Sequence, residues 1–222
     1  GLLTPHINNS NILGSSLQLP YFHVLSDNKD LTFKPTFFDK DILMIQNEYR
    51  QQNKNSYFIT DFNITDGYKS KSSQKENTLI HFFSKYESDL DFENFISSSL
   101  DISYQKVNND TYLKIFDTNI VDTELKPESF DTLTSDIELN LEHEKFNFTS
   151  GFTAYEDLSK PNSDRYQYIL PYYNFSKNFF DNSNFGSFDF VSQGDNILKD
   201  TNSLRSRMIN NLNIQSFNFI SD

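Results

Sequence analysis

Strict alternation of apolar and polar residues is the main pattern along this chain. Between Ile96 and Lys106, every second position, from Ser97 to Gln105, is polar. A helix would scatter the intervening apolar side chains around its axis, whereas a strand gathers them on one face. The period of two therefore predicts a half-buried β-strand over this segment.

The same period recurs and predicts about 11 or 12 strands at hairpin intervals, in an all-β, antiparallel up-and-down sheet. The clearest further segments are 13–21, 31–37, 133–143 and 146–154. Weaker candidates are 43–51, 57–64, 78–86, 165–175, 185–191 and 204–214. Polar breaks separate them at 27–30, 69–77, 87–94, 157–164 and 182–184. The segment 108–130 has no clean period, so we expect a longer excursion there, and no helix longer than a turn or two.

Composition supports strands and narrows the functional classes. Phe 23 and Tyr 12 supply strand formers, whereas alanine occurs once, at Ala154. The net charge of −12 argues against a nucleic-acid surface, because phosphate binding needs positive faces. Cysteine is absent, which excludes a disulfide framework and a thiolate nucleophile within these residues. No apolar run approaches the roughly 20 residues that a membrane-spanning helix needs.

Candidate chemistry is sparse. None of the four histidines, His6, His23, His81 and His143, has the spacing of a paired metal ligand, and for His143 a lone exposed histidine is the favoured interpretation. We find neither a glycine-rich phosphate loop nor a Gly-x-Ser-x-Gly turn. The sequence therefore predicts no enzyme, no metal site and no cofactor.

Alternation alone fits both a soluble β-sandwich and a membrane β-barrel. Strands of roughly ten residues match a tilted bilayer crossing, whereas strands of soluble proteins average about five or six. Aromatic doublets near the strand ends are typical of the aromatic girdles of outer-membrane barrels. They are Tyr21-Phe22, Phe37-Phe38, Tyr57-Phe58, Phe82-Phe83, Tyr172-Tyr173 and Phe179-Phe180. These features favour a transmembrane barrel, with a ligand-binding sandwich of lectin or adhesin type and a generic porin as alternatives.

Several short segments resemble, in order, the barrel domain of the LptD family (LPS-assembly proteins, also called the organic solvent tolerance family) of Gram-negative outer membranes. They are Gly1-Leu2-Leu3-Thr4-Pro5, Leu19-Pro20-Tyr21-Phe22, Asp30-Leu31-Thr32-Phe33-Lys34-Pro35, Glu48-Tyr49-Arg50, Asn108-Asn109-Asp110-Thr111-Tyr112-Leu113-Lys114 and Leu170-Pro171. Tyr172 stands where the family has a glutamine, and the likeness is thin beyond Phe185.

The resemblance implies that residues 1–222 are the N-terminal portion of a barrel domain of about 26 strands. A periplasmic jelly roll would precede them and further strands would follow, in keeping with a chain that starts at Gly1 rather than Met. The implied function is lipopolysaccharide transport and insertion into the outer leaflet of the cell outer membrane. The implied partners are lipopolysaccharide, an LptE-like lipoprotein plug and an LptA-like periplasmic bridge reached through the jelly roll, with no nucleic acid.

Pro20 and Pro35 match the family's lateral-gate prolines in position and spacing. In that family the acyl chains leave between the first and last strands, while the sugars pass through the lumen. Proline has no N–H, so each residue removes one possible ladder hydrogen bond. The resemblance therefore predicts a weakened seam at these residues, whereas without it they would simply mark strand ends or an edge.

A wide lumen needs polar side chains, and the alternation assigns one face of the sheet to them. The residues expected there are Gln18, Lys34, Glu48, Arg50, Asp61, His81, Asp101, Asp136, Glu138 and Glu142. Many are acidic, which conflicts with tight binding of anionic lipopolysaccharide unless divalent ions bridge the two. We therefore assign no binding residue among them.

Overall fold

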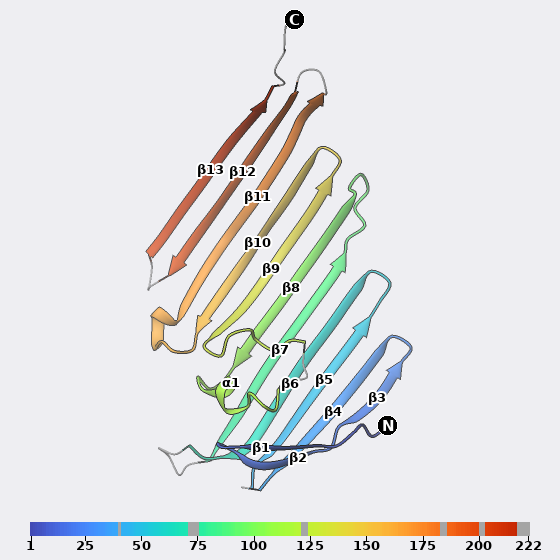
Figure 1. The fold of residues 1–222 in the computed structure, drawn as a ribbon, viewed down its shortest axis with the longest axis vertical. Helices are drawn as coiled ribbons and strands as arrows, with labels where there is room; N and C mark the ends of the chain where they lie inside the picture. Colours follow the sequence, from blue (N-terminus) through green and yellow to red (C-terminus); the bar gives the residue numbers. More distant parts are fainter. Residues whose placement is uncertain (40, 71–75, 121–123, 183–185, 200–202, 217–222) are drawn as a thin grey trace, which may run out of the picture.

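One antiparallel sheet makes up most of this computed structural model, which describes residues 1–39, 41–70, 76–120, 124–182, 186–199 and 203–216 (Figure 1). The strands are β1 (His6–Ser10), β2 (Gly14–Gln18), β3 (Tyr21–Ser26), β4 (Lys29–Phe38), β5 (Leu43–Gln52), β6 (Ser56–Tyr68), β7 (Asn77–Asp89), β8 (Ser97–Val107), β9 (Thr132–His143), β10 (Phe146–Asp157), β11 (Tyr166–Asn182), β12 (Gly186–Lys199) and β13 (Ser203–Gln215). The helical turns are α1 (Tyr112–Ile115) and η1 (Asn162–Arg165).

The strands follow one another as neighbours, which confirms the predicted all-β, antiparallel up-and-down fold. The 13-stranded sheet runs β1-β2-β4 and then consecutively to β13, while β3 pairs with β4 beside β2. The structure adds β1, which the pattern did not predict, and divides the expected strand at 13–21 into β2 and β3. Segment 108–130 is the expected excursion, and its only described helix is the four-residue α1.

The connections differ in length at the two ends of the sheet. At one end the turns are short, at 27–28, 53–55 and 144–145, with 90–96 somewhat longer. At the other end lie the long connections 69–76, 108–131 and 158–165, together with the short ones 39–42 and 200–202. No helix in the described ranges is long and apolar enough to cross a membrane.

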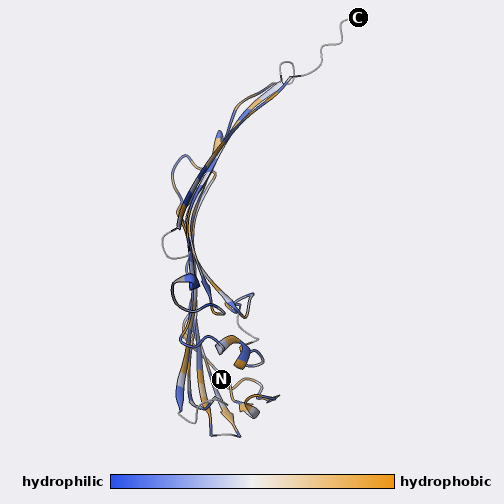
Figure 2. Ribbon diagram, turned by 90° about the vertical axis from the view of Figure 1, so that its left-hand side faces the viewer, coloured by the Kyte–Doolittle hydropathy of each residue, from blue (hydrophilic) through white to orange (hydrophobic). Residues whose placement is uncertain are grey.

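The sheet is bowed, and its two faces differ in character. Figure 2 shows the curvature edge-on, with α1 and the β1–β2 hairpin on the concave side. Strand register places Met44, Asp61 and His81 on that side, because these residues meet the buried cluster under α1. Their sequence neighbours Ile45, Phe62 and Phe82 therefore point to the convex side.

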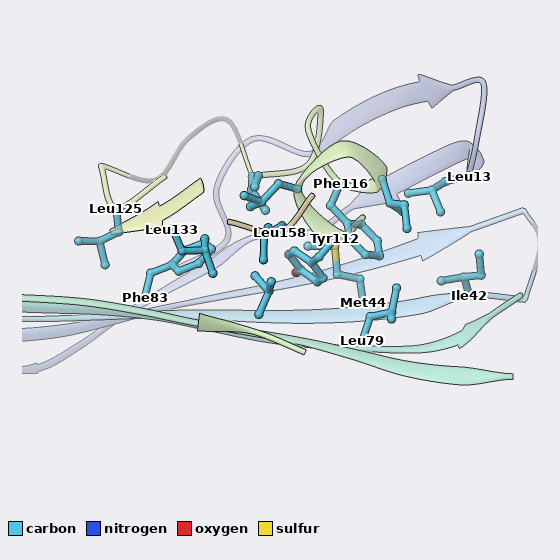
Figure 3. Packing of buried hydrophobic residues seen from close by; sticks show 14 of the residues in the cluster. Leu13, Ile42, Met44, Leu79, Phe83, Tyr112, Phe116, Leu125, Leu133 and Leu158 are labelled. Carbon is cyan, nitrogen blue, oxygen red and sulfur yellow. The ribbon is translucent and has the colours of Figure 1, made fainter. Parts of the chain in front are cut away.

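The hydrophobic core lies at the long-loop end of the concave face (Figure 3). Residues 108–120, here called the cap, cover β5, β6 and β7 and contribute Tyr112 and Phe116 to a buried cluster. Met44, Leu79 and Phe83 rise from the sheet to meet them. The core is thus formed between the cap and one sheet face, while a second sheet is absent from the described residues.

Candidate functional site

The two predicted gate prolines lie on either side of a break in the strand that borders β4. β2 pairs with β4 through Leu17 and Phe37, and β3 pairs with β4 through Tyr21 and Phe33. Both pairings have the same register, so β2 and β3 are two parts of one strand that is interrupted at 19–20. Pro35 lies opposite this interruption, inside β4.

Pro35 removes one hydrogen bond from the ladder at this break. The Leu19 N–H donates to the Pro35 carbonyl at 3.0 Å. In an antiparallel ladder, two residues paired in this way exchange two bonds, but Pro35 has no N–H to donate back to Leu19. The β4–β5 ladder loses nothing, because the backbone groups of Pro35 point toward Leu19 and away from β5. We call the Leu19–Pro35 pair and its flanking residues the seam.

Pro20 removes a hydrogen bond on the opposite edge of the same strand. Its carbonyl accepts from the Leu3 N–H at 2.8 Å, and the Phe22 N–H donates to the Gly1 carbonyl at 2.8 Å. These two bonds flank the isolated bridge between Leu2 and Tyr21. The reciprocal bond to Leu3 is missing because Pro20 has no donor. Pro35 therefore removes a hydrogen bond from the ladder between β4 and the β2–β3 strand. Pro20 removes one from the pairing between that strand and residues 1–3.

All ten residues predicted for the polar face share the concave side, as their register shows. Cross-strand pairs include Glu48 with Asp61 and Asp101 with Glu138. Part of the set is buried: Asp61 and His81 lie beneath the cap, and Glu48 is buried beside Lys34 and Arg50. His143, for which exposure was favoured, is half-buried, with its ring packed against Phe95 and Phe146.

Under the cap, buried polar side chains connect the sheet to α1. The Tyr112 hydroxyl accepts from Asn63 Nδ2 at 2.5 Å and lies 2.7 Å from His81 Nδ1. The Tyr112 hydroxyl can donate to His81 Nδ1 or accept from it, depending on which ring nitrogen carries the proton. Burial raises the pKa of Tyr112, so the hydroxyl keeps its proton.

The other side of the His81 ring faces a buried carboxylate. His81 Nε2 lies 3.2 Å from Asp61 Oδ1, close enough for attraction but not aligned as a hydrogen bond. Gln46 Nε2 donates to Asp61 Oδ2 at 2.7 Å. The His81 ring also stacks on Phe83, with centroids 4.3 Å apart. We call Gln46, Asp61, Asn63, His81 and Tyr112 the polar anchor; it fixes α1 to β5, β6 and β7.

The polar anchor has a structural arrangement rather than a catalytic one. Asp61, Asn63 and His81 are fully buried beneath the cap, so a substrate would have no access to them. No group of three or more acidic or histidine side chains in the described part of the chain is placed to hold a metal ion.

The convex face is apolar and exposed. Large hydrophobic side chains are exposed along it from β4 to β13, namely Phe33, Phe37, Leu43, Ile64, Phe82, Tyr104, Ile137, Phe152, Leu204, Met208, Leu212 and Ile214. So many exposed apolar side chains on one face are unfavourable in water and are typical of contact with another apolar phase or partner. The polar face of the same strands lies on the concave side, so the two faces of the sheet differ in polarity.

Comparison with known proteins gives a partial match. The LPS-assembly protein LptD of Legionella pneumophila, in strains Lens, Paris and Philadelphia 1, is 26% identical over 129 residues. This chain is similar to LptD. The match covers 54% of the chain and 15% of each relative, so the chain spans only a small part of their length. No protein-family model matches the chain.

The sequence did not predict the structural role of Tyr112, although this residue lies in a segment that resembles LptD. Tyr112 belongs to the segment Asp110-Thr111-Tyr112-Leu113-Lys114, which carries part of the resemblance, but its role in anchoring the cap was not predicted. Its partners His81 and Asn63 lie 31 and 49 residues away in the sequence, so no local pattern connects them. The signal available in the sequence for Tyr112 was its place in this short motif, within a segment (108–130) that has no clean period.

Proposed function

We propose that residues 1–222 form part of the wall of an outer-membrane β-barrel that transports lipopolysaccharide to the outer leaflet and releases it sideways at a proline-thinned seam. The observation that carries the proposal is the exposed apolar convex face on strands whose other face is polar. Lipid tails are the apolar phase that matches such a face, and a polar lumen matches the concave one.

Closure into a barrel follows from backbone chemistry. In lipid, each unpaired N–H or C=O costs several kcal/mol, so a membrane-spanning sheet must have no free edge. Here β13 pairs only with β12 among the described residues. Further strands of the complete protein would pair with β13 and finally meet the N-terminal edge formed by β3 and residues 1–3.

Loop lengths orient the wall. Outer-membrane barrels have short periplasmic turns and longer extracellular loops. The short turns at 27–28, 53–55 and 144–145 would then face the periplasm. The cap and the β1–β2 hairpin would lie at the extracellular end, inside the barrel.

The seam supports lipid release over simple diffusion. One bond is missing at Pro35 and another at Pro20, and a typical net hydrogen bond contributes about 0.5–1.5 kcal/mol, with more where water is excluded. A diffusion porin gains nothing from a weak seam, whereas a glycolipid transporter needs one part of its wall to open. The LptD relatives are named for lipopolysaccharide assembly, which agrees with this choice.

Three partners follow from the proposal. Lipopolysaccharide is the cargo, an LptE-like lipoprotein would occupy the lumen, and an LptA-like bridge would deliver cargo through a jelly roll outside this chain. Many luminal side chains are acidic, including Asp101, Asp136 and Glu138, so we expect divalent cations to accompany the phosphates of the cargo.

Depletion of the complete protein in its own cell tests this function. We expect newly made lipopolysaccharide to disappear from the cell surface while small-solute uptake is unchanged, and re-expression to restore it. A porin would give the opposite pattern. Unchanged surface lipopolysaccharide after depletion would contradict the proposal.

A further inference from the structure

The β1–β2 hairpin does not lie in the wall of the sheet. β1 pairs only with β2 in the described structure, and β2 pairs with β4 at just Ser16, Leu17 and Gln18. Figures 1 and 2 show the hairpin running across the long-loop end on the concave side. β1 is therefore joined to the sheet through β2 alone and lies on the concave side.

Contacts with the cap hold the hairpin there. Leu13, at the hairpin turn, is fully buried in the same cluster as Phe116 of the cap (Figure 3). Asn8 Nδ2 on β1 donates to the Thr118 carbonyl of the cap at 3.1 Å. An apolar contact and a polar one thus join two segments that are about a hundred residues apart in the sequence.

The hairpin turn also contacts the loop that follows β4. Asp39 Oδ2 accepts from the Ser15 N–H at 3.1 Å, and the Asp39 N–H donates to the Ser15 carbonyl at 3.0 Å. Gly14 has a φ of +82°, and a Cβ at this position would lie 2.1 Å from Asp39 Oδ1. The positive φ makes glycine the favoured residue at this turn, and a larger residue would also have to displace the Asp39 side chain.

The cap is itself fixed to β5, β6 and β7 through the polar anchor. Tyr112 contacts Asn63 and His81, and Leu113 and Phe116 are buried beside it. A displacement of β2 away from β4 would thus have to break the hairpin's contacts with the cap or lift the cap from the sheet. β3, beyond the break at Pro20, has no hydrogen bond to the cap among the described residues.

From these contacts we infer that the cap clamps the extracellular half of the seam through the β1–β2 hairpin, and that hairpin and cap must separate before lipopolysaccharide sugars can leave sideways. This inference rests on the proposed function. The clamp consists of Asn8 and Leu13 on the hairpin and Phe116 and Thr118 on the cap. The strands at the Leu19–Pro35 pair can part only after this contact is released.

Cysteine pairs introduced into the complete protein test the clamp directly, and residues 1–222 contribute no native cysteine that would compete with them. Asn8→Cys with Thr118→Cys would be joined by oxidation or by a short bis-maleimide. Crosslinking should reduce export of newly made lipopolysaccharide by at least tenfold, and reduction of the disulfide should restore it. Failure of the pair to crosslink in the resting protein would contradict the contact itself.

A matched control pair is Asn140→Cys with Thr149→Cys, which are directly opposed on β9 and β10 of the concave face. Crosslinking this pair should leave export unchanged, because these strands do not separate. Full export by the protein crosslinked at positions 8 and 118 would overturn the clamp and leave the transport function intact. If depletion of the parent protein leaves surface lipopolysaccharide unchanged, the proposed function itself has failed.

A loosening variant gives an independent measurement. Leu13→Ala removes the apolar part of the hairpin contact while β2 keeps its pairing with β4. We expect several-fold higher sensitivity to large antibiotics that the intact barrel excludes, with the protein present at its normal level. Unchanged sensitivity at normal abundance would contradict the clamp.

Discussion

Leu19 donates a backbone hydrogen bond to Pro35 at 3.0 Å, and Pro35 has no N–H with which to return one. The pair sits where the strand bordering β4 is interrupted between β2 and β3. The interruption between β2 and β3 therefore lies directly opposite Pro35 of β4, the residue that lacks an N–H donor. This coincidence weakens the ladder locally without disturbing the pairing of β4 with β5.

Pro35→Ala restores the donor to this pair. We expect the new bond to stabilise the ladder by about 0.5–1.5 kcal/mol and to slow lipopolysaccharide export by the complete protein. Hydrogen exchange should show that the amide created at position 35 is protected and that the Leu19 amide exchanges more slowly than in the unsubstituted protein. Pro161→Ala, in the loop before η1, is the control and should leave export unchanged. Normal export despite added protection would contradict the account, because it would show that the strength of the seam does not control transport.

Pro20→Ala acts on the other edge of the same strand. The new N–H faces the Leu3 carbonyl, so the amide created at position 20 should be protected, the Leu3 amide should exchange more slowly, and exchange of the Leu19 amide should stay unchanged. If the prolines thin successive ladders, the double variant should slow export more than either single one. Equal export by the single and double variants would argue against two separate contributions.

Tyr112→Phe removes only the hydroxyl that joins the cap to the sheet. His81 Nδ1 then loses its partner in a fully buried site, which costs about 1–3 kcal/mol. We expect faster protease cleavage within residues 108–120 of the membrane-embedded protein. Tyr104→Phe, on the exposed convex face, should leave the cleavage rate unchanged. Equal protection of both variants would exclude the polar anchor as the attachment of the cap.

Lysine substitutions on the two faces of β9 should differ in their effect. Ile137→Lys places a charge on the convex face, where contact with lipid would cost about 2–4 kcal/mol near the bilayer midplane and less toward its surface. Asn140→Lys, on the concave face, should cost about 1 kcal/mol or less. Denaturant unfolding of the complete protein in bilayers measures both. A larger loss for Asn140→Lys would reverse the assignment of the faces.

Much of the fold follows from local sequence because alternation is a local property. Strands β5 to β10 appear where the period of two predicts them, with ends that shift by a few residues. β1 was missed because Ile7 is its only apolar residue. The division between β2 and β3 was missed because both keep the same register against β4, so the alternation continues through Pro20 without a change of phase.

The site is less local, and the sequence predicted it only in part. The resemblance singled out Pro20 and Pro35. Which ladder loses a hydrogen bond at each proline, however, depends on the strand that lies beside it. The burial of Asp61 and His81 arises from the cap, which belongs to a distant and aperiodic segment. Tertiary contacts of this kind have no periodic signal in the sequence.

The central claim is that the convex face contacts lipid while the concave face contacts water. Single cysteines at positions 136 to 141 of β9, labelled with a fluorophore in the membrane-embedded complete protein, test it most directly. The account predicts that lipid-attached quenchers act at 137, 139 and 141, and that aqueous quenchers act at 136, 138 and 140. Equal aqueous quenching at all six positions would contradict it.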